Sequence, residues 1–234
     1  MSKICFYYIK TDYIDYLKKY ESDHRNCTCV PNIKYYSNEK FFYGTVLNVQ
    51  GIDYYVPISS KTKGRQDDIL IRNKKGDIKG SLRFNYMIPV PNKSLSMLDL
   101  KNGSFTEKQT IRIKEELAFC MRNKDKIQKQ AQVTYDRIVE KTNTNLINNS
   151  CDFKLLETAY IIYCHDNDLP LSEELQKRYA EITGNKPTTE SSISVQTPFR
   201  SKPQPPQKSQ SSSKFSVSMA QLRANRKEPR SDTR

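Results

Sequence analysis

The 234-residue chain contains no tryptophan, only seven glycines and only two histidines. The glycines form neither a G-x-G-x-x-G nor a Walker spacing, and no G-x-S-x-G is present, which excludes the common phosphate-binding loops and the hydrolase nucleophile elbow. The two histidines, His24 and His165, lie in separate predicted elements, a loop and a helix end. This separation argues against a nuclease that uses two histidines as acid and base.

Metal-binding and disulfide patterns are equally sparse. His24, Cys27 and Cys29 lie close together, and Cys164-His165 offers two more ligands, but the paired spacing of structural zinc sites is missing. The acidic pair Asp67-Asp68 is surrounded by cations, which disfavours magnesium. The six cysteines are too scattered for a disulfide framework. We therefore expect reduced thiols, no metal and no cofactor.

Long apolar segments are also lacking. No stretch approaches the ~18 consecutive apolar residues of a membrane span, and residues 1–10 show no apolar run followed by a small-residue cleavage site. We expect a soluble cytoplasmic protein that has no membrane partner.

Positive charge is what the sequence has in excess. Lys and Arg number 39 against 26 Asp and Glu, a formal net charge of +13. Residues 184–234 hold ten basic and three acidic residues together with six Pro and eleven Ser. Such a composition cannot bury enough apolar surface to offset the entropy of ordering. We expect a folded domain over residues 1–183 and a disordered, basic Ser/Pro-rich tail over 184–234.

The hydrophobic patterns place strands first and helices later. Strands are predicted over residues 3–10, 41–49, 54–58, 69–72 and 81–90. Helices are predicted over 12–20, 106–123 and 125–141, after Asp152 and from Ser172 to about Gly184, with a loop over 21–31. This order indicates an α+β domain with a mostly antiparallel sheet.

Lysines, serines and a tyrosine gather around the predicted hairpin of residues 41–58. Lys40 precedes its first strand and Ser59-Ser60 follow its second, so antiparallel pairing should bring them to one end of the sheet. Residues 61–83 add eight basic and three acidic residues. Such a site can bind a phosphodiester and a stacked base. It can also cleave RNA, because the 2′-OH is a nucleophile that needs only in-line positioning, proton removal and charge stabilisation. A lysine with a lowered pKa could remove the proton.

Several blocks of the chain come in the order seen in one known family. They are residues 13–17, 38–47, 54–60, 86–90, 98–100 and 123–127. Over about residues 1–165 the chain resembles the ToxN/AbiQ family, the endoribonuclease toxins of type III toxin–antitoxin systems. The resemblance implies a compact, strongly twisted, mostly antiparallel sheet flanked by about four helices, similar to the Kid/MazF toxins.

The resemblance also implies an activity and its partners. Members cut single-stranded RNA without metal and leave a 2′,3′-cyclic phosphate, often at A-rich sites. The expected partners are target mRNA and an antitoxin RNA of repeated pseudoknots, which the toxin processes and which blocks the active groove in a cyclic toxin–RNA assembly. Several such systems abort phage infection.

By the same resemblance the active-site residues are Tyr36, Lys40, Ser59 and Ser60, with Lys61 as the second lysine. The register around Thr62 leaves Lys63 as the other candidate for that lysine. Ser60 would position or activate the 2′-OH, Lys40 would act on the phosphate or in proton transfer, and Ser59 with Lys61 would stabilise charge. The residues expected to bind RNA around this group are Lys34, Asn38, Lys63, Arg65, Arg83, Asn85, Lys124 and Lys126. The alternative is a non-catalytic RNA-binding or mobile-element accessory protein that uses the same basic groove.

Overall fold

The structure, a computed structural model, describes residues 5–35, 38–103 and 105–184, with only the backbone at residues 34, 35, 38 and 39. The chain divides into two units, residues 1–189 and 190–234, and the second unit lies outside the described residues. So does the tail from residue 185 onward. The strands are β1 (Cys5–Ile9), β2 (Lys34–Tyr35), β3 (Asn38–Glu39), β4 (Phe42–Val49), β5 (Ile52–Ser59), β6 (Ile69–Arg72), β7 (Ile78–Leu82), β8 (Ile88–Pro89) and β9 (Leu95–Met97). The α-helices are α1 (Thr11–Arg25), α2 (Glu107–Arg122), α3 (Lys124–Val139), α4 (Thr144–Asn148), α5 (Phe153–Asp166) and α6 (Glu173–Thr183), and the 3₁₀ turns are η1 (Phe84–Tyr86) and η2 (Asn92–Ser94).

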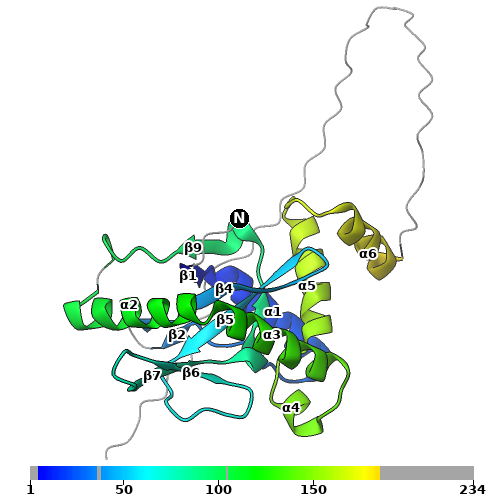
Figure 1. Ribbon diagram of the computed structural model, residues 1–234. Helices are drawn as coiled ribbons and strands as arrows, with labels where there is room; N and C mark the ends of the chain where they lie inside the picture. Colours follow the sequence, from blue (N-terminus) through cyan, green and yellow to red (C-terminus); the bar gives the residue numbers. More distant parts are fainter. Residues whose placement is uncertain (1–4, 36–37, 104, 185–234) are drawn as a thin grey trace, which may run out of the picture. The chain divides into compact units, whose positions relative to one another are not determined.

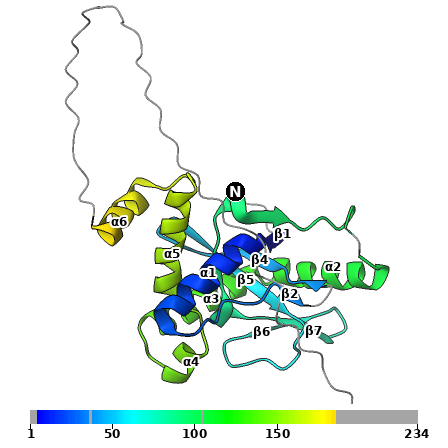
Figure 2. The same ribbon diagram turned by 180° about the vertical axis from the view of Figure 1, so that it is seen from behind.

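One sheet organises the domain. Its strands follow the order β6-β7-β5-β4-β1-β9, β8 adds to β5, and every pairing is antiparallel. The two opposite views show α1 on one side of the sheet and α2 and α3 on the other (Figures 1 and 2). The predicted α+β class with an antiparallel sheet is confirmed. The described residues contain six α-helices rather than about four.

The hairpin that the sequence predicts is present as β4–β5, in the middle of the sheet, but β5 begins at Ile52 rather than Tyr54. Its two-residue loop, Gln50-Gly51, has positive φ at both positions, 50° and 85°. This backbone matches the right-handed twist of the flanking strands. Inside β4, a Cβ on Gly44 would lie 1.9 Å from the ring of Tyr55. Only a glycine leaves room for that ring between the two strands.

The strand predicted over residues 81–90 is interrupted. The chain runs along one edge of β5 as β7, turns out through η1 and returns as β8. The backbone still follows β5 at both ends of the turn, since Arg83 N donates to Pro57 O at 3.3 Å and Val90 N donates to Asp53 O at 3.1 Å. A continuous strand was therefore wrong, because the apolar pattern of this segment reports burial and not extension.

Helix α1 continues to Arg25, beyond the predicted end at residue 20. The reason is Glu21, whose side chain is fully buried and accepts hydrogen bonds from Arg25 Nη1 (2.8 Å), Cys29 N (2.7 Å) and Asp152 N (2.8 Å). A glutamate on the inner face breaks the apolar periodicity, which led to the wrong prediction of a loop from residue 21. The carboxylate instead joins the end of α1 to the start of α5.

Helices α2, α5 and α6 begin where the sequence predicts. Thr106 and Gln109 form a reciprocal capping box at α2, Asp152 Oδ1 accepts from Leu155 N at 3.1 Å, and Ser172 Oγ accepts from Leu175 N at 3.4 Å. Gly184 ends α6 in the left-handed conformation. The short helix α4 was not predicted. No helix among the described residues is long and apolar enough to span a membrane.

A buried carboxylate also anchors the helical side of the core. Glu157 of α5 has no exposed side-chain surface and accepts from the hydroxyls of Tyr54 (3.1 Å) and Tyr135 (2.6 Å). Lys154 Nζ and Arg178 Nη2 each lie 3.1 Å from its other oxygen. This single carboxylate therefore connects β5, α3, α5 and α6.

Candidate active site

The strand register brings the two ends of the hairpin together. Phe42 pairs with Pro57, and Ile58 N donates to Phe41 O at 3.1 Å, so this register continued by one residue would set Lys40 opposite Ser59. Ser59 pairs on its other side with Ser81 of β7. Paired residues of an antiparallel sheet share a face. The backbone thus places an amine and two hydroxyls in a row across three neighbouring chain segments.

The environment of Lys40 favours its neutral form. Burial lowers the pKa of the Lys40 amine, and the positive charges of Lys61, Arg83 and Lys18 lower this pKa further. Both effects disfavour a protonated amine. Among the lysines near the hairpin, Lys40 is therefore a candidate for the proton acceptor of lowered pKa that the sequence suggests.

Hydrogen bonds order the chain directly after β5. Ser59 Oγ accepts from Lys61 N at 3.2 Å, and Ser81 Oγ donates to Lys61 O at 2.9 Å. Ser59 is half-buried at the end of β5, whereas Ser60 and Lys61 are exposed. The main chain of Lys61 is therefore held from both sides while its side chain stays accessible. Ser81 was not predicted from the sequence, because only the pairing of β7 with β5 brings it here.

Arg83 occupies a different place from the one we expected. It is only 6% exposed, and its guanidinium lies 3.2 Å from Asp68 Oδ2, 3.2 Å from Ser81 Oγ and 3.2 Å from Lys63 O. A side chain that is committed to these partners has little surface left for RNA. We assign Arg83 to holding the loop after β5 and to adding positive charge beside Lys40.

The two candidate lysines after the serines differ in their relation to Lys40. The charge of Lys61 acts on Lys40, whereas Lys63 is not among the groups that lower its pKa. The backbone carbonyl of Lys63 is instead held by Arg83. Lys61 is therefore the lysine whose charge acts on Lys40, and Lys63 is an exposed cation of the β5–β6 loop.

The tight packing under this loop depends on Gly80. A Cβ at this position would lie 2.6 Å from Ser59 O and 3.5 Å from Glu116 Oε1. Glu116 is buried, and Arg112 Nε donates to it at 2.9 Å while Arg112 Nη2 donates to Lys79 O at 2.8 Å. Helix α2 thus supports the strand end that carries Ser59.

The other predicted RNA-binding residues are spread over several elements. Arg65 is exposed and donates to Tyr86 Oη at 3.1 Å, whereas Asn85 is 3% exposed. Lys124 and Lys126 are exposed on the first turn of α3. For Lys34 and Asn38 the structure gives only the backbone pairing of β2 with β3. Tyr36 lies outside the described residues, so its role stays a prediction.

The histidines and acidic residues that were weighed as alternative sites have separate surroundings. The rings of His24 and Tyr20 stack in α1, whereas His165 stacks on Tyr179 with centroids 3.7 Å apart. Asp67 pairs with Arg137 and Asp68 with Arg83. Within residues 5–35, 38–103 and 105–184 no group of three His, Cys, Asp or Glu side chains is placed to hold a metal ion.

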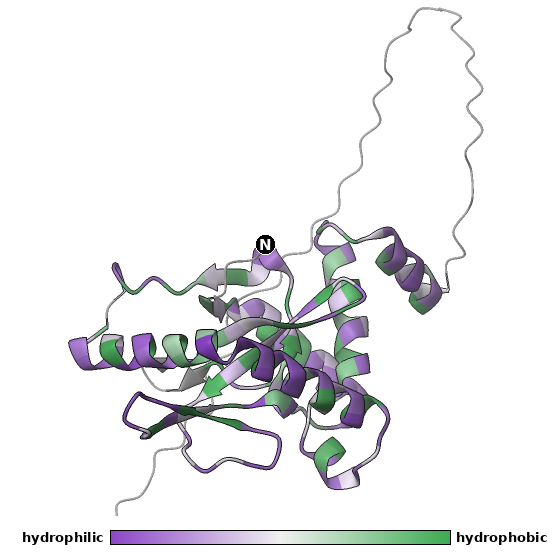
Figure 3. Ribbon diagram, in the orientation of Figure 1, coloured by the Kyte–Doolittle hydropathy of each residue, from purple (hydrophilic) through white to green (hydrophobic). Residues whose placement is uncertain are grey.

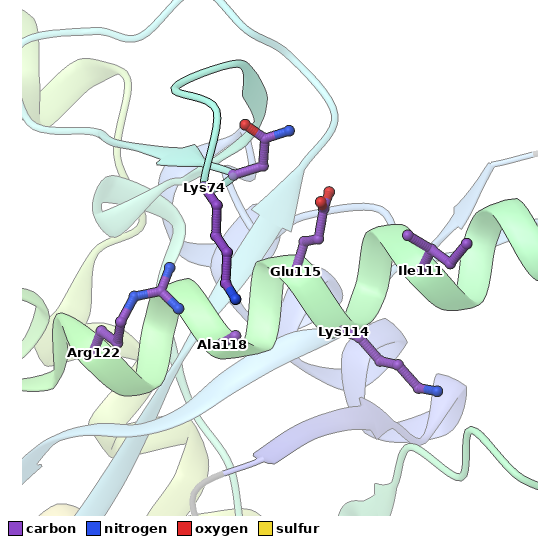
Figure 4. Close-up of a pocket in the computed structure, with 7 residues that line it drawn as sticks. Lys74, Ile111, Lys114, Glu115, Ala118 and Arg122 are labelled. Carbon is purple, nitrogen blue, oxygen red and sulfur yellow. The ribbon is translucent and has the colours of Figure 1, made fainter.

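A second cationic surface lies on the outer side of α2. A hollow of about 360 Å³ is lined there by Lys74, Lys114, Arg122 and the exposed Ile111. The side chain of Lys74 reaches from the β6–β7 turn toward Ala118 of α2 (Figure 4).

The β5–β6 and β6–β7 loops are mainly hydrophilic, in contrast to the apolar segments of β4 and β5 (Figure 3). None of Lys74, Lys114 and Arg122 was predicted to bind RNA.

The family description "Toxin ToxN, type III toxin-antitoxin system" matches residues 5–161. The chain belongs to the ToxN family of type III toxin–antitoxin toxins. The matched segment contains every predicted site residue and ends inside α5, so α6 and the tail lie beyond it. The resemblance inferred from the sequence blocks is thereby confirmed.

Relatives agree with this ToxN assignment over most of their own length. The chain is 28% identical to endoribonuclease AbiQ of Lactococcus lactis subsp. lactis over 68% of this chain and 88% of AbiQ. It is 29% identical to endoribonuclease ToxN of Pectobacterium atrosepticum over 66% of this chain and 91% of that protein.

Solved structures are similar in fold as well. The structure of AbiQ, a lactococcal anti-phage endoribonuclease of the type III systems, superimposes with a TM-score of 0.60 and 26% identity, covering 70% of this chain and 99% of AbiQ. A second structure, from a bacterial antiviral system that a processed non-coding RNA regulates, gives a TM-score of 0.57 and 27% identity, covering 66% of this chain and 95% of the other. The domain thus has the fold of characterised ToxN-family toxins.

Proposed function

We propose that this ToxN-family toxin is a metal-independent endoribonuclease that cuts single-stranded RNA and leaves a 2′,3′-cyclic phosphate. What supports the proposal is Lys40, whose pKa is lowered by burial and by the charge of Lys61, at the end of the hairpin where Ser59 pairs with Ser81. The relatives AbiQ and ToxN are both named endoribonucleases.

The groups at this site can supply each requirement of the reaction. A neutral Lys40 amine can take the proton from the 2′-OH as its oxygen attacks the adjacent phosphorus. Ser60 is exposed at the strand end, where its hydroxyl can position that 2′-OH. Ser59 and Lys61 can donate to the non-bridging oxygens as negative charge grows on the phosphate. The P–O5′ bond then breaks, and the leaving 5′-oxygen takes up a proton.

The resident inhibitor is proposed to be an RNA. We infer that an antitoxin RNA of repeated pseudoknots, which this protein itself processes, covers the active groove and assembles with it into a closed toxin–RNA ring. A toxin freed from that RNA would cleave mRNA and abort phage infection. A related antiviral system is regulated by a processed non-coding RNA, which supports this assignment.

The deciding experiment is to sequence the ends of RNA cut by the purified protein with a chelator present. We expect discrete cuts whose upstream fragments end in a 2′,3′-cyclic phosphate, which polynucleotide kinase converts to a free 3′-OH. Uncut RNA would leave the alternative of a non-catalytic RNA-binding protein with the same basic groove. Cuts that disappear with the chelator would instead indicate a metal-dependent nuclease.

A further inference from the structure

The hollow on the outer side of α2, here named the α2 hollow, has no role in the proposed chemistry. Its volume is about 360 Å³, within the range of small-ligand sites. Lys74, Lys114 and Arg122 bring three positive charges to its lining, and Glu115 brings one negative charge. The lining therefore has an excess of positive charge, which favours an anionic ligand.

The cations of the α2 hollow keep their hydrogen-bond donors unused. Arg112, on the same helix, donates to Glu116 Oε1 at 2.9 Å and to Lys79 O at 2.8 Å. Arg122 and the two lysines of the hollow are exposed, and their side chains form no hydrogen bond or ion pair with any residue that the structure describes. Ammonium and guanidinium groups are donors only, and their strong hydrogen bonds are made to carboxylates and phosphates. The α2 hollow thus offers several donors to phosphate oxygens.

The two walls of the α2 hollow are fixed to each other. Lys74 lies in the β6–β7 turn, which is closed by Asn73 Oδ1 accepting from Asp77 N at 2.9 Å. Arg112 Nη2 joins α2 to the same hairpin through Lys79 O. Figure 4 shows the Lys74 side chain extended from this turn toward the helix. The cations are therefore presented by two ordered elements, which lowers the cost of binding.

An exposed apolar side chain adjoins these cations. Ile111 is 52% exposed and lines the α2 hollow together with Ala118. A duplex turns its bases inward, whereas a single strand presents base faces as well as phosphates to a protein. Arginine guanidinium planes stack on such bases, and Arg122 lies on the same helix face. The mixture of cations and apolar surface fits single-stranded RNA.

Strand β7 links the α2 hollow to the candidate active site. It begins at Ile78, shortly after Lys74 in the turn, and Ser81 near its end pairs with Ser59. The three residue steps from Ile78 to Ser81 cover about 10 Å along a strand. One RNA strand can therefore occupy the Lys40 site and the α2 hollow together.

We propose that the α2 hollow is a second binding site for the RNA strand that is cut, with phosphates on Lys74, Lys114 and Arg122 and a base against Ile111. The inference rests on the proposed function in that this strand continues from the Lys40 site. The α2 hollow holds the strand and takes no part in bond cleavage, so it acts on KM and not on kcat.

The first test measures binding, so it does not depend on cleavage. The full chain with Lys40→Ala is titrated into a fluorescently labelled single-stranded RNA of about twelve nucleotides, long enough for both sites. Adding Lys74→Ala and Lys114→Ala together should weaken binding at least about tenfold. The slope of log Kd against log salt should fall by about 1.4, since each phosphate contact of a single strand contributes about 0.7. An unchanged affinity and slope would overturn the proposal.

The control and the reverse variant exclude a general effect of net charge. Lys177→Glu, at an exposed position of α6, changes the net charge by the same two units and should alter Kd less than about twofold. Glu115→Gln removes the negative charge of the lining and should tighten binding about twofold or more. An equal loss in Lys177→Glu, or weaker binding by Glu115→Gln, would contradict a phosphate site in the α2 hollow.

A variant of the apolar wall tests the contact with a base. Ile111→Ser keeps every charge and should weaken binding about threefold while the salt slope stays the same, because only apolar contact is lost. An unchanged affinity would overturn the assignment of a base to Ile111.

Cleavage kinetics separate this proposal from the proposed function. With Lys40 intact, the double variant Lys74→Ala/Lys114→Ala should raise KM for the same RNA and keep kcat within about twofold. A lower kcat with unchanged KM would overturn the proposal. If the parent chain cuts no RNA but the double variant binds it more weakly, the nuclease proposal fails and the α2 site stands. If the parent cuts RNA and the double variant binds as tightly as the control, the reverse holds.

Discussion

Glu157 is a fully buried ionisable group and Lys40 is a partly buried one, and the charges that act on them differ. Glu157 is fully buried and receives two tyrosine hydroxyls and two cations. Lys40 is near Lys61, Arg83 and Lys18, which carry the same charge as itself. Opposite partners offset the cost of burying a charge, whereas like charges add to it. The first arrangement stabilises the fold, and the second lowers a pKa at the expense of stability, which is typical of a functional site.

The largest effect is expected at Lys40. Lys40→Ala should lower the single-turnover rate of RNA cleavage by roughly 10²–10⁴-fold, the usual contribution of a general acid or base. The melting temperature should stay close to that of the parent, because Lys40 is only partly buried. Lys63→Ala, which changes an exposed lysine of the β5–β6 loop, is the control and should keep its rate within about twofold. A Lys40→Ala protein as active as this control would contradict the proposed role.

Glu157 should show the reverse pattern. Glu157→Ala removes the acceptor of the Tyr135 hydroxyl and leaves Lys154 and Arg178 without their carboxylate, so we expect a loss of about 3 kcal/mol in the free energy of unfolding. Urea denaturation measures this loss. Cleavage by the folded fraction should change little, because the residue lies on the helical side of the core. Glu157→Gln retains one acceptor and should lose less stability than Glu157→Ala.

The comparison becomes sharper at the two neighbouring lysines. Lys61→Ala should slow cleavage by about tenfold or more, since it removes a donor that can meet the growing phosphate charge. Lys63→Ala should have less than a twofold effect on the rate. Equal losses in the two variants would mean that general attraction of the RNA backbone, and not a positioned cation, accounts for both. Repeating the assays at high salt separates the two contributions.

The pH dependence follows from the direction of the Lys40 shift. Because burial and neighbouring cations lower the Lys40 pKa, cleavage should rise with pH along a limb that lies below the usual lysine value of 10.5. Lys61→Ala removes one of these cations and should move the limb to higher pH. For stability the sign is the same: the folded state binds this proton less strongly than the unfolded chain, so stability rises as pH increases through the lowered pKa. A limb that Lys61→Ala leaves unmoved would show that another group titrates.

The smallest effect is expected from Tyr36→Phe, because we predict that the Tyr36 ring, and not its hydroxyl, stacks on a base near the cut. Tyr36→Phe should keep most of the cleavage rate, because the ring is retained. Tyr36→Ala should lose it, since base stacking on an aromatic ring contributes roughly 1–3 kcal/mol. The same single-turnover assay measures both variants. Equal loss in both would make the hydroxyl the working group.

Local signals explain what could be predicted of the fold. Two apolar segments on either side of a turn that contains Gln50-Gly51 predicted the β4–β5 hairpin. Capping residues predicted the starts of helices α2, α5 and α6. Predictions went wrong where a polar residue faces inward or an apolar segment turns. Because Glu21 faces inward, the predicted helix ended at residue 20, whereas α1 continues to Arg25. The turn η1 interrupts the segment over residues 81–90 that was predicted as one strand.

Only the part of the candidate site that follows from the pairing of two strands could be predicted from the sequence. Antiparallel pairing implied that Lys40 and Ser59 meet, and the family resemblance directed attention to the same residues. The burial of Arg83 had no signal in the sequence, because an arginine in a basic stretch looks the same whether it faces solvent or an aspartate. The hollow that the β5–β6 loop, η1, the end of α3 and the region of α4 form together depends on side chains from four separate parts of the chain.

By itself, the amino-acid sequence determined the class of fold, the order of its elements and the excess of positive charge. It also indicated that the strand ends next to Lys40 and Ser59 belong to the candidate site. These properties depend on neighbours along the chain or on one hairpin. Only the tertiary structure decided which cations act on Lys40 and which arginine is buried. Burial and electrostatic fields arise from groups far apart in sequence, so they exist only once the chain has packed.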